Sequence, residues 1–345
     1  LASSAASDVY KRQTFFLSAI LDNLTTSIVM IMVLRKLVHK KEERMIYASL
    51  IILAANSGGA FSPIGDVTTI MLWIKGMITT GGVIREIILP SLISVVVPAL
   101  ILQYRLKGHL EKPETATTGD ALYFSKTERN IVFFLGVGGL MFVPVFRFLT
   151  GLPPFMGILL VLGLLWGTTE IFFRNKPVDG TMKRRVEMLL SRIDMTTILF
   201  FLGILMAVTT LQETGVLTAF GRTLNDVSGG NHYLVTGVIG AVSSIVDNVP
   251  LVAGCMGMYD IATPAAVAAN PALVDFAVDG LFWQLLAYCA GVGGSMLIIG
   301  SAAGVVVMGL EKITFGWYMK NITWIAATGY VAGILCYWLQ KAIGF

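Results

Sequence analysis

The sequence predicts an all-α polytopic membrane protein with inverted repeats, each containing a re-entrant hairpin and a broken transmembrane helix. Three features predict this fold: an apolar composition, a series of long apolar runs, and polar motifs that recur inside apolar sequence. Of the 345 residues, 55% are hydrophobic and 13% are charged, and the mean hydropathy is +0.77. A typical soluble domain has about 25% charged residues. Much of this chain is therefore expected to face lipid.

Five apolar runs are long enough to cross a bilayer as helices. The hydrocarbon core requires about 20 mostly apolar residues for each helical crossing. The runs cover residues 87–104, 131–149, 155–173, 195–211 and 322–339. Short charged connections separate them, which favours a bundle of helices over a single anchored soluble domain. Strands of a membrane barrel would alternate in polarity, and these runs do not.

The placement of Lys and Arg predicts how the chain is threaded. If the loop at residues 35–44 is cytoplasmic, most basic residues fall on that side, in residues 35–44, 105–129 and 174–192 and at Lys312 and Lys320. This agrees with the positive-inside rule. The threading requires residues 14–34 and 232–259 to form re-entrant segments of opposite orientation. The formal charge of +4 thus reflects membrane topology, and no nucleic-acid partner is expected.

Domain boundaries follow from composition. Residues 1–13 are polar and lead abruptly into apolar sequence, so we interpret them as a leader foreign to the natural protein and expect further helices before residue 14 in the complete protein. Residues 14–104 form the first repeat, with a hairpin arm, a broken helix and a following span. Residues 105–130, which lack an apolar period, form a cytoplasmic linker. Residues 131–345 form the second repeat, with several spans, the hairpin 232–259, the broken helix 281–309 and the last span 322–339.

Two segments recur along the chain. Ser18, Ile20, Asp22 and Asn23 recur at an offset of 225 residues as Ser243, Ile245, Asp247 and Asn248. Ala55, Gly58, Gly59, Ile64 and Gly65 recur at an offset of 235 residues as Ala290, Gly293, Gly294, Ile299 and Gly300. Membrane transporters are often built from inverted repeats whose broken helices meet near the middle of the bilayer. The recurrence therefore predicts a transport site where the repeats meet.

The recurring residues have the chemistry of a cation site. The Asp-Asn pairs suit hairpin tips, and Gly and Pro in the second segment can unwind a helix and free carbonyls to line a cavity. Asp66 has Ser301 as its counterpart, so the site is symmetric in backbone but asymmetric in charge. The candidate cation- and proton-binding residues are Asp22, Asn23, Thr25, Asn56, Ser57, Asp66, Asp247, Asn248 and Ser295. The candidate helix-break glycines are Gly58, Gly59, Gly293 and Gly294.

Four segments together resemble the NhaD sodium/proton antiporters of the ion transporter superfamily. They read LDNLTT, AANSGGAFSPIGDVTTIMLW, SSIVDNVP and AGVGGSMLIIGSAAGVVVMG. The resemblance covers most of residues 15–345. It implies exchange of sodium or lithium for protons, a scaffold domain, a transport domain and a homodimer. Arsenite permeases and dicarboxylate transporters of the superfamily share the hairpin plan, so an oxyanion or dicarboxylate transporter is the alternative.

Each candidate also has a purely structural interpretation. Asp22 and Asp247 could close their hairpins as Asx turns or N-caps, and Asp66 could cap the helix that resumes at Val67. Hydroxyls such as those of Ser57, Thr25 and Ser295 could bond the preceding turn of their own helix. As functional groups, Asp22, Asn23, Asp247 and Asn248 would bind Na⁺ or Li⁺, a hard cation that prefers oxygen ligands.

The functional expectation is a secondary transporter that works by alternating access in a bacterial inner membrane, and not an enzyme. A carboxyl group in a medium of low dielectric constant can hold either a cation or a proton, so the two substrates would compete. No cofactor is expected, and the expected partners are the lipid bilayer and a second copy of the chain. The three acidic candidates favour a cation over an anion as the substrate.

Overall fold

The computed structural model describes residues 2–38, 40–103, 125–152, 154–174 and 213–344, with residues 199, 202–203, 206–207 and 209–211. Every regular element in these ranges is helical, as the sequence predicts. The chain divides into two compact units, one made of Leu1–Pro113 and Leu205–Phe345 and the other of Glu114–Ile204. Most of the predicted linker 105–130 and of the run 195–211 lies outside the described residues.

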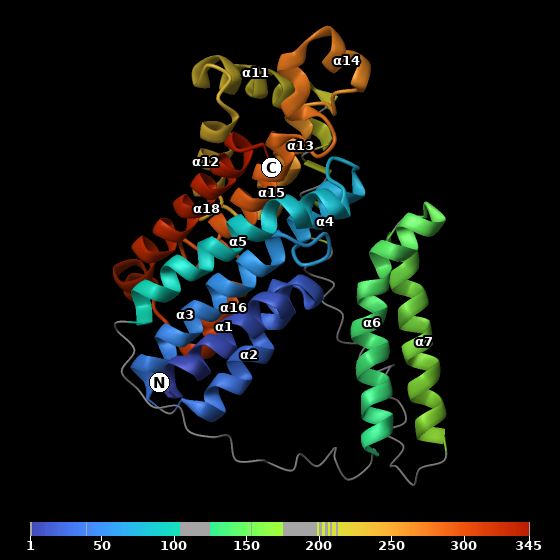
Figure 1. The fold of residues 1–345 in the computed structure, drawn as a ribbon, viewed down its shortest axis with the longest axis vertical. Helices are drawn as coiled ribbons and strands as arrows, with labels where there is room; N and C mark the ends of the chain where they lie inside the picture. Colours follow the sequence, from blue (N-terminus) through green and yellow to red (C-terminus); the bar gives the residue numbers. More distant parts are fainter. Residues whose placement is uncertain are drawn as a thin grey trace. The chain divides into compact units, whose positions relative to one another are not determined.

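The first unit contains two series of helices (Figure 1). The first series is α1 (Ala2–Leu21), α2 (Asn23–Leu37), α3 (Lys41–Ala60), α4 (Val67–Ile74) and α5 (Thr80–Gln103). The second is α11 (Val216–Ser228), α12 (His232–Val242), α13 (Asn248–Met258), α14 (Pro264–Ala269), the 3₁₀ turn η2 (Pro271–Phe276), α15 (Leu281–Gly293), α16 (Ala302–Glu311), α17 (Phe315–Tyr318), the π turn η3 (Met319–Thr323) and α18 (Trp324–Ala342). Helix α1 continues across residue 13, so no helix end marks the border of the predicted leader.

Helices α3 and α15 form the buried centre of this unit. All residues from Tyr47 to Ala60 in α3 and from Phe282 to Gly293 in α15 are buried. The two helices contact each other, and each also contacts α5. A helix that is apolar on all sides is one that protein or lipid surrounds on all sides. These two buried stretches also carry the recurring glycines near their C-terminal ends.

Helices α5 and α18 pack side by side against this centre (Figure 1). Pro98 interrupts the hydrogen-bond ladder of α5 because it has no amide proton to donate to the carbonyl of Ser94. Gly329 of α18 packs directly against that carbonyl, and a Cβ atom there would collide with it. The glycine lets the two backbones come into contact.

Two helical stretches within the described residues are long and apolar enough to cross a membrane, Thr80–Gln103 and Phe315–Ala342. They contain the predicted runs 87–104 and 322–339, apart from the last residue of the first run. The predicted runs 131–149 and 155–173 lie in the second unit, in α6 (Lys126–Thr150) and α7 (Pro154–Arg174). These two helices pack against each other, with Gly139 against Val161 and Gly157 against Phe146.

Candidate functional site

Three aspartates cap the starts of three helices. Asp22 precedes α2 and accepts hydrogen bonds from the amide and the hydroxyl of Thr25, both at 2.8 Å. Asp66 precedes α4 and accepts from the amide and the hydroxyl of Thr68, at 2.9 and 2.8 Å. Asp247 precedes α13 and accepts from the amide two residues later, at 3.4 Å. Such caps satisfy amides that have no partner within the helix. The capping roles that the sequence left open are confirmed.

A buried network of amides and hydroxyls reaches the remaining oxygen of Asp66. The amide nitrogen of Asn56 donates to the hydroxyls of Ser295 and Ser301, both at 2.9 Å. The amide nitrogen of Asn23 donates to the side-chain oxygen of Asn56 at 3.1 Å and to Asp66 Oδ2 at 2.7 Å. Asn23 is half-buried, and the other four side chains are buried. We call these five residues the Asn56 network.

The Asn56 network joins two helix breaks. In the first, α3 ends at Ala60 and α4 starts at Val67. In the second, α15 ends at Gly293 and α16 starts at Ala302. Asp66 caps α4, and the serine that caps α16 stands at the corresponding position of the second break. Polar groups of two segments far apart in the sequence therefore meet where α3, α4, α15 and α16 begin or end.

Glycines allow close backbone contacts at both breaks. A Cβ atom on Gly58 would collide with the carbonyl of Phe15, and one on Gly293 would collide with the carbonyl of Gly240. These two contacts correspond to each other at the sequence offsets of 225 and 235 residues. Gly59 and Gly294, the next glycines of the two breaks, also lie against backbone carbonyls. In each case the carbonyl belongs to the residue six positions later, Gly65 or Gly300. Only glycine fits such an approach.

A serine in each hairpin arm repeats the correspondence. Ser18 of α1 donates its hydroxyl to the carbonyl of Ala55, at 2.6 Å. Ser243 at the end of α12 donates its hydroxyl to the carbonyl of Ala290, at 3.0 Å. The donors differ by 225 positions and the acceptors by 235. The same side-chain bond thus holds an arm against a broken helix in both parts of the chain.

The two aspartates at the hairpin tips lie near the network. Asp22 caps the start of α2 directly before Asn23 of the network, and Asp247 caps the start of α13. Both are half-buried, whereas Asp66 is 1% exposed. The helix that follows each tip contacts a helix of the other break: α2 contacts α16, and α13 contacts α4. Each tip aspartate therefore starts a helix that packs against the helix break of the other half.

Comparison with known proteins identifies the family. The profile described as "Citrate transporter" (CitMHS) matches residues 13–278. The chain belongs to this family. Its members are membrane transporters, so the protein is an integral membrane protein and not an enzyme.

Several proteins that resemble this chain are named as sodium/proton antiporters. Sodium/proton antiporter 1 of Arabidopsis thaliana is 46% identical over 326 residues, which cover 94% of this chain and 54% of that protein. Sodium/proton antiporter 2 of the same plant is 45% identical over 328 residues, with 94% and 74% covered. The Na⁺/H⁺ antiporter NhaD of Halomonas elongata is 31% identical over 356 residues, with 96% and 67% covered. The chain therefore spans between about half and three quarters of these relatives.

The candidate residues differ in whether they reach the Asn56 network. Asn23, Asn56, Asp66 and Ser295 meet in the Asn56 network, and the four glycines lie at the two breaks. Asp22 and Thr25 bond to each other, and Ser57 accepts a hydrogen bond from Ser94 of α5, at 2.9 Å. Within the described residues, no side-chain hydrogen bond joins Asp247 or Asn248 to the network. Asn248 is nevertheless buried, at 5% exposure.

Three residues at the site were not among the sequence candidates. Ser301 was recognised as the counterpart of Asp66, but its bond to Asn56 was not foreseen. Thr68 holds Asp66 through its amide and hydroxyl, and the spacing Asp-x-Thr was an available capping signal. Ser94 supports Ser57 from α5, and a serine inside an apolar span was the corresponding signal.

A cation at this site would be held mainly by oxygen atoms. Within the described residues, no group of three or more His, Cys, Asp or Glu side chains is arranged to hold a metal ion. Amide, hydroxyl and carbonyl oxygens would therefore share the coordination with a carboxylate. Hard cations accept such mixed oxygen ligands, and soft transition metals prefer nitrogen and sulfur.

Proposed function

We propose that the protein exchanges Na⁺ or Li⁺ for H⁺ across the membrane by alternating access at the Asn56 network. The buried carboxylate of Asp66, held beside the amides of Asn23 and Asn56, is the observation that carries this proposal. A carboxylate inside a membrane protein is costly unless a cation, a proton or a polar partner compensates it. Competition of Na⁺ and H⁺ for one carboxylate would couple the two fluxes.

The hairpin tips complete the proposed cation site. Asp22 directly precedes Asn23 of the network, and Asp247 caps α13, which contacts the helix that Asp66 caps. We assign them as further cation and proton ligands, with Asn23 and Asn248 as neutral oxygen ligands. Their capping bonds do not prevent this role, because a carboxylate has several lone pairs to offer. Thr25, Ser57 and Ser295 would shape the site through their hydroxyls.

The proposal includes the two inverted repeats. In each, a hairpin (α1–α2 or α12–α13) lies against a broken helix (α3–α4 or α15–α16). The paired serine–carbonyl bonds and the paired glycine contacts support this assignment. Opposite orientations of the hairpins in the membrane rest on the distribution of basic residues. The hairpins and broken helices would move together against a scaffold that includes α6 and α7.

An anion substrate is the competing function, because the family description names citrate. Citrate and other dicarboxylates would approach three carboxyl groups, those of Asp22, Asp66 and Asp247. Like charges at short range in a medium of low dielectric constant repel strongly. Relatives named sodium/proton antiporters also favour the cation. Oxyanion or dicarboxylate transport therefore remains the alternative that the experiment below must separate.

The remaining parts of the proposal concern assembly and location. We propose a homodimer within the lipid bilayer and no cofactor, because exchange by alternating access needs no covalent step. The relatives come from a plant and from bacteria. A bacterial inner membrane is the proposed location, and fractionation of the source cells would test it.

The decisive experiment measures substrate-driven proton movement. The full-length protein is reconstituted into liposomes that contain a pH-sensitive dye, and Na⁺, Li⁺, K⁺, arsenite, succinate and citrate are added in turn. Antiport predicts a response to Na⁺ and Li⁺ that the Asp22→Asn and Asp247→Asn variants lose. A response only to citrate or succinate would replace the cation exchanger with the anion transporter.

Competition between the substrates gives the sign of the pH dependence. Na⁺ can bind only after the site has released its proton, so the KM for Na⁺ should fall as the pH rises and then level off when the site is deprotonated. Initial rates at several Na⁺ concentrations and pH values would measure this. A KM that does not change with pH would mean that the cation and the proton use separate groups.

A further inference from the structure

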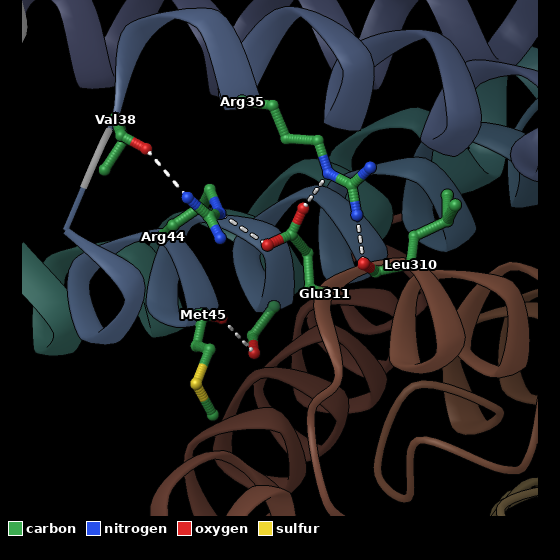
Figure 2. A network of polar contacts seen from close by, with 7 residues as sticks. Arg35, Val38, Arg44, Met45, Leu310 and Glu311 are labelled. Atoms are coloured by element: carbon green, nitrogen blue, oxygen red, sulfur yellow. Dashed lines mark hydrogen bonds and ion pairs between the residues drawn. The ribbon is translucent and has the colours of Figure 1, made fainter.

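A second polar cluster joins three of the site helices at a distance from the site. The carboxylate of Glu311, at the end of α16, is fully buried, with 0% side-chain exposure. It pairs with Nε of Arg35 in α2 at 2.6 Å and with Nε of Arg44 in α3 at 2.5 Å. Figure 2 shows the carboxylate between the two guanidinium groups. We call these three residues the Glu311 clamp.

Backbone carbonyls fix the two arginines further. Arg35 also donates to the carbonyl of Leu310, and Arg44 donates to the carbonyl of Val38 at 3.3 Å (Figure 2). Each guanidinium thus bonds the Glu311 carboxylate and one neighbouring carbonyl. Charged hydrogen bonds of this kind are directional, so they restrict how the helices can slide or turn.

Each clamp residue stands on a helix that reaches the Asn56 network. In α2, Arg35 follows Asn23 by about three turns. In α3, Arg44 precedes Asn56 by about the same length. In α16, Glu311 lies at the opposite end from the Ser301 cap. With a rise of 1.5 Å per residue, the clamp and the network are about 15–18 Å apart along all three helices. The three helices are thus held together at both ends, and α16 contacts both α2 and α3.

The site depends on the register of these helices. The bonds from Asn56 to Ser301 and from Asn23 to Asn56 measure 2.9 and 3.1 Å. A hydrogen bond weakens steeply once its donor and acceptor move beyond about 3.5 Å. A slide of α16 by a small fraction of a turn would therefore separate the hydroxyl of Ser301 from Asn56. A buried ion pair is weak evidence for stability, and setting the register of packed helices is the best-attested role of buried polar groups.

We propose that Glu311 is a positioning residue for cation binding, because its pairs with Arg35 and Arg44 set the register of α16 against α2 and α3. The clamp touches neither substrate, and it acts through the spacing between Ser301 and the two asparagines of the network. This inference rests on the proposed exchange of Na⁺ for H⁺. Loss of the clamp should raise the KM for Na⁺ far more than it lowers the maximal rate.

The test compares Glu311→Gln with a matched control in the full-length protein in liposomes. Because misplacement of a binding group by about 1 Å can cost as much as 100-fold, we expect the KM for Na⁺ to rise about tenfold, while the maximal rate per folded protein falls less than about twofold. The control is Glu43→Gln, which removes the exposed surface pair with Lys40 and should leave both values unchanged. Adding Na⁺ should also raise the Tm of the purified Glu311→Gln protein only at higher concentrations than for the wild type.

Two further variants keep the test decisive if Glu311→Gln does not fold. Arg35→Gln removes one pair and leaves Arg44 to compensate Glu311, so it should fold and show a smaller rise in the KM. The triple variant Arg35→Gln, Arg44→Glu and Glu311→Arg keeps one ion pair without setting two guanidinium groups side by side, and it should restore part of the Na⁺ affinity that Glu311→Gln loses.

The outcomes separate this inference from the proposed function. A wild-type KM for Na⁺ in Glu311→Gln, or in Arg35→Gln if only that variant folds, would overturn the clamp and leave the antiport intact. A lower maximal rate with an unchanged KM would also overturn it. Failure of the wild-type protein to move protons in response to Na⁺ would overturn the proposed function itself.

Discussion

The two helix breaks share a backbone and differ in chemistry. At both, a serine in the hairpin arm bonds a carbonyl of the broken helix, and a glycine lies against a carbonyl of the arm. Both are followed by a helix with a side-chain cap, but the cap is Asp66 in the first break and Ser301 in the second. Only the first break therefore brings a charge into the network. The two breaks share their backbone contacts, and the difference between Asp66 and Ser301 places the carboxyl group at the first break.

The hairpin tips show the same asymmetry. The first tip is a single residue, Asp22, at the backbone dihedral angle φ of 75°, and the next residue, Asn23, reaches the network. Several non-helical residues separate α12 from α13 at the second tip, and Asn248 has no such bond within the described part of the chain. The first tip and break thus supply both amides and the carboxylate, while the second break supplies hydroxyls. In the proposed exchange, the two breaks would contact a cation unequally.

The largest effect is expected at the residue where the breaks differ most. Asp66→Asn keeps the size of the side chain but removes the carboxylate, so Na⁺-driven proton movement should fall by about 100-fold or more, which corresponds to about 2.7 kcal/mol or more of lost interaction. The dye assay in liposomes measures this.

A double variant that exchanges the two caps tests whether the position of the carboxylate matters. Asp66→Ser combined with Ser301→Asp keeps one carboxylate at the two breaks but moves it to the second. This variant should fold but stay inactive in the dye assay, because Asn23 bonds the side chain at position 66 and not the one at position 301. Full activity in the double variant would mean that the two breaks are interchangeable.

Equal loss of stability is expected where the breaks are alike. Gly58→Ala and Gly293→Ala each force a Cβ atom against a backbone carbonyl, and overpacking of this kind costs typically about 1–3 kcal/mol. The Tm of the purified variants in detergent measures the loss. Gly254→Ala in α13 is the control, because nothing lies near its added Cβ atom. If only one of the two variants were destabilised, the packing correspondence between the breaks would be rejected.

A smaller effect on affinity is expected from the neutral cap. Ser301→Ala removes one of the two hydroxyl partners of the Asn56 amide, and the loss of one buried hydrogen bond costs about 1 kcal/mol, or about a fivefold rise in the KM for Na⁺. Rate measurements at several Na⁺ concentrations test this. An effect as large as that of Asp66→Asn would show that the two caps share one role.

The smallest effect is expected from the serines that hold the hairpin arms. Ser18→Ala and Ser243→Ala each remove a hydroxyl bond to a backbone carbonyl, so each should lower stability by about 1 kcal/mol. The two changes in Tm should agree within the error of the measurement, and the KM for Na⁺ should change little. A large rise in the KM for only one of them would give that arm a direct role in binding.

Local sequence signals indicated where several helices start and end. Asp22, Asp66 and Asp247 were recognised as possible caps, and Gly58 and Gly293 as possible helix breaks, because these residues have strong local backbone preferences. The predicted hairpin 232–259 contains α12 and α13, which end at Val242 and Met258, and the predicted broken helix 281–309 contains α15 and most of α16. Local preferences act over a few residues, and a sequence shows them directly.

Long-range partners were predicted less completely. The sequence grouped Asn23, Asn56 and Asp66 as candidates but did not show which of them bond to one another. Glu311 was not recognised, because a single acidic residue at the end of an apolar helix has no local feature that reveals two arginines more than 260 positions earlier. Such contacts depend on how distant helices pack, which no short segment of sequence contains.

The sequence by itself determined that this is a helical membrane protein with two recurring helix breaks, because apolar composition and glycine, proline and aspartate spacing act through solvent and local backbone geometry. Only the tertiary structure decided that the two breaks meet at Asn56, that Asp66 is bonded by Asn23, and that Glu311 pairs with arginines on two other helices. Those outcomes follow from close packing of helices remote in the chain, where shifts of a fraction of an ångström make or break a hydrogen bond.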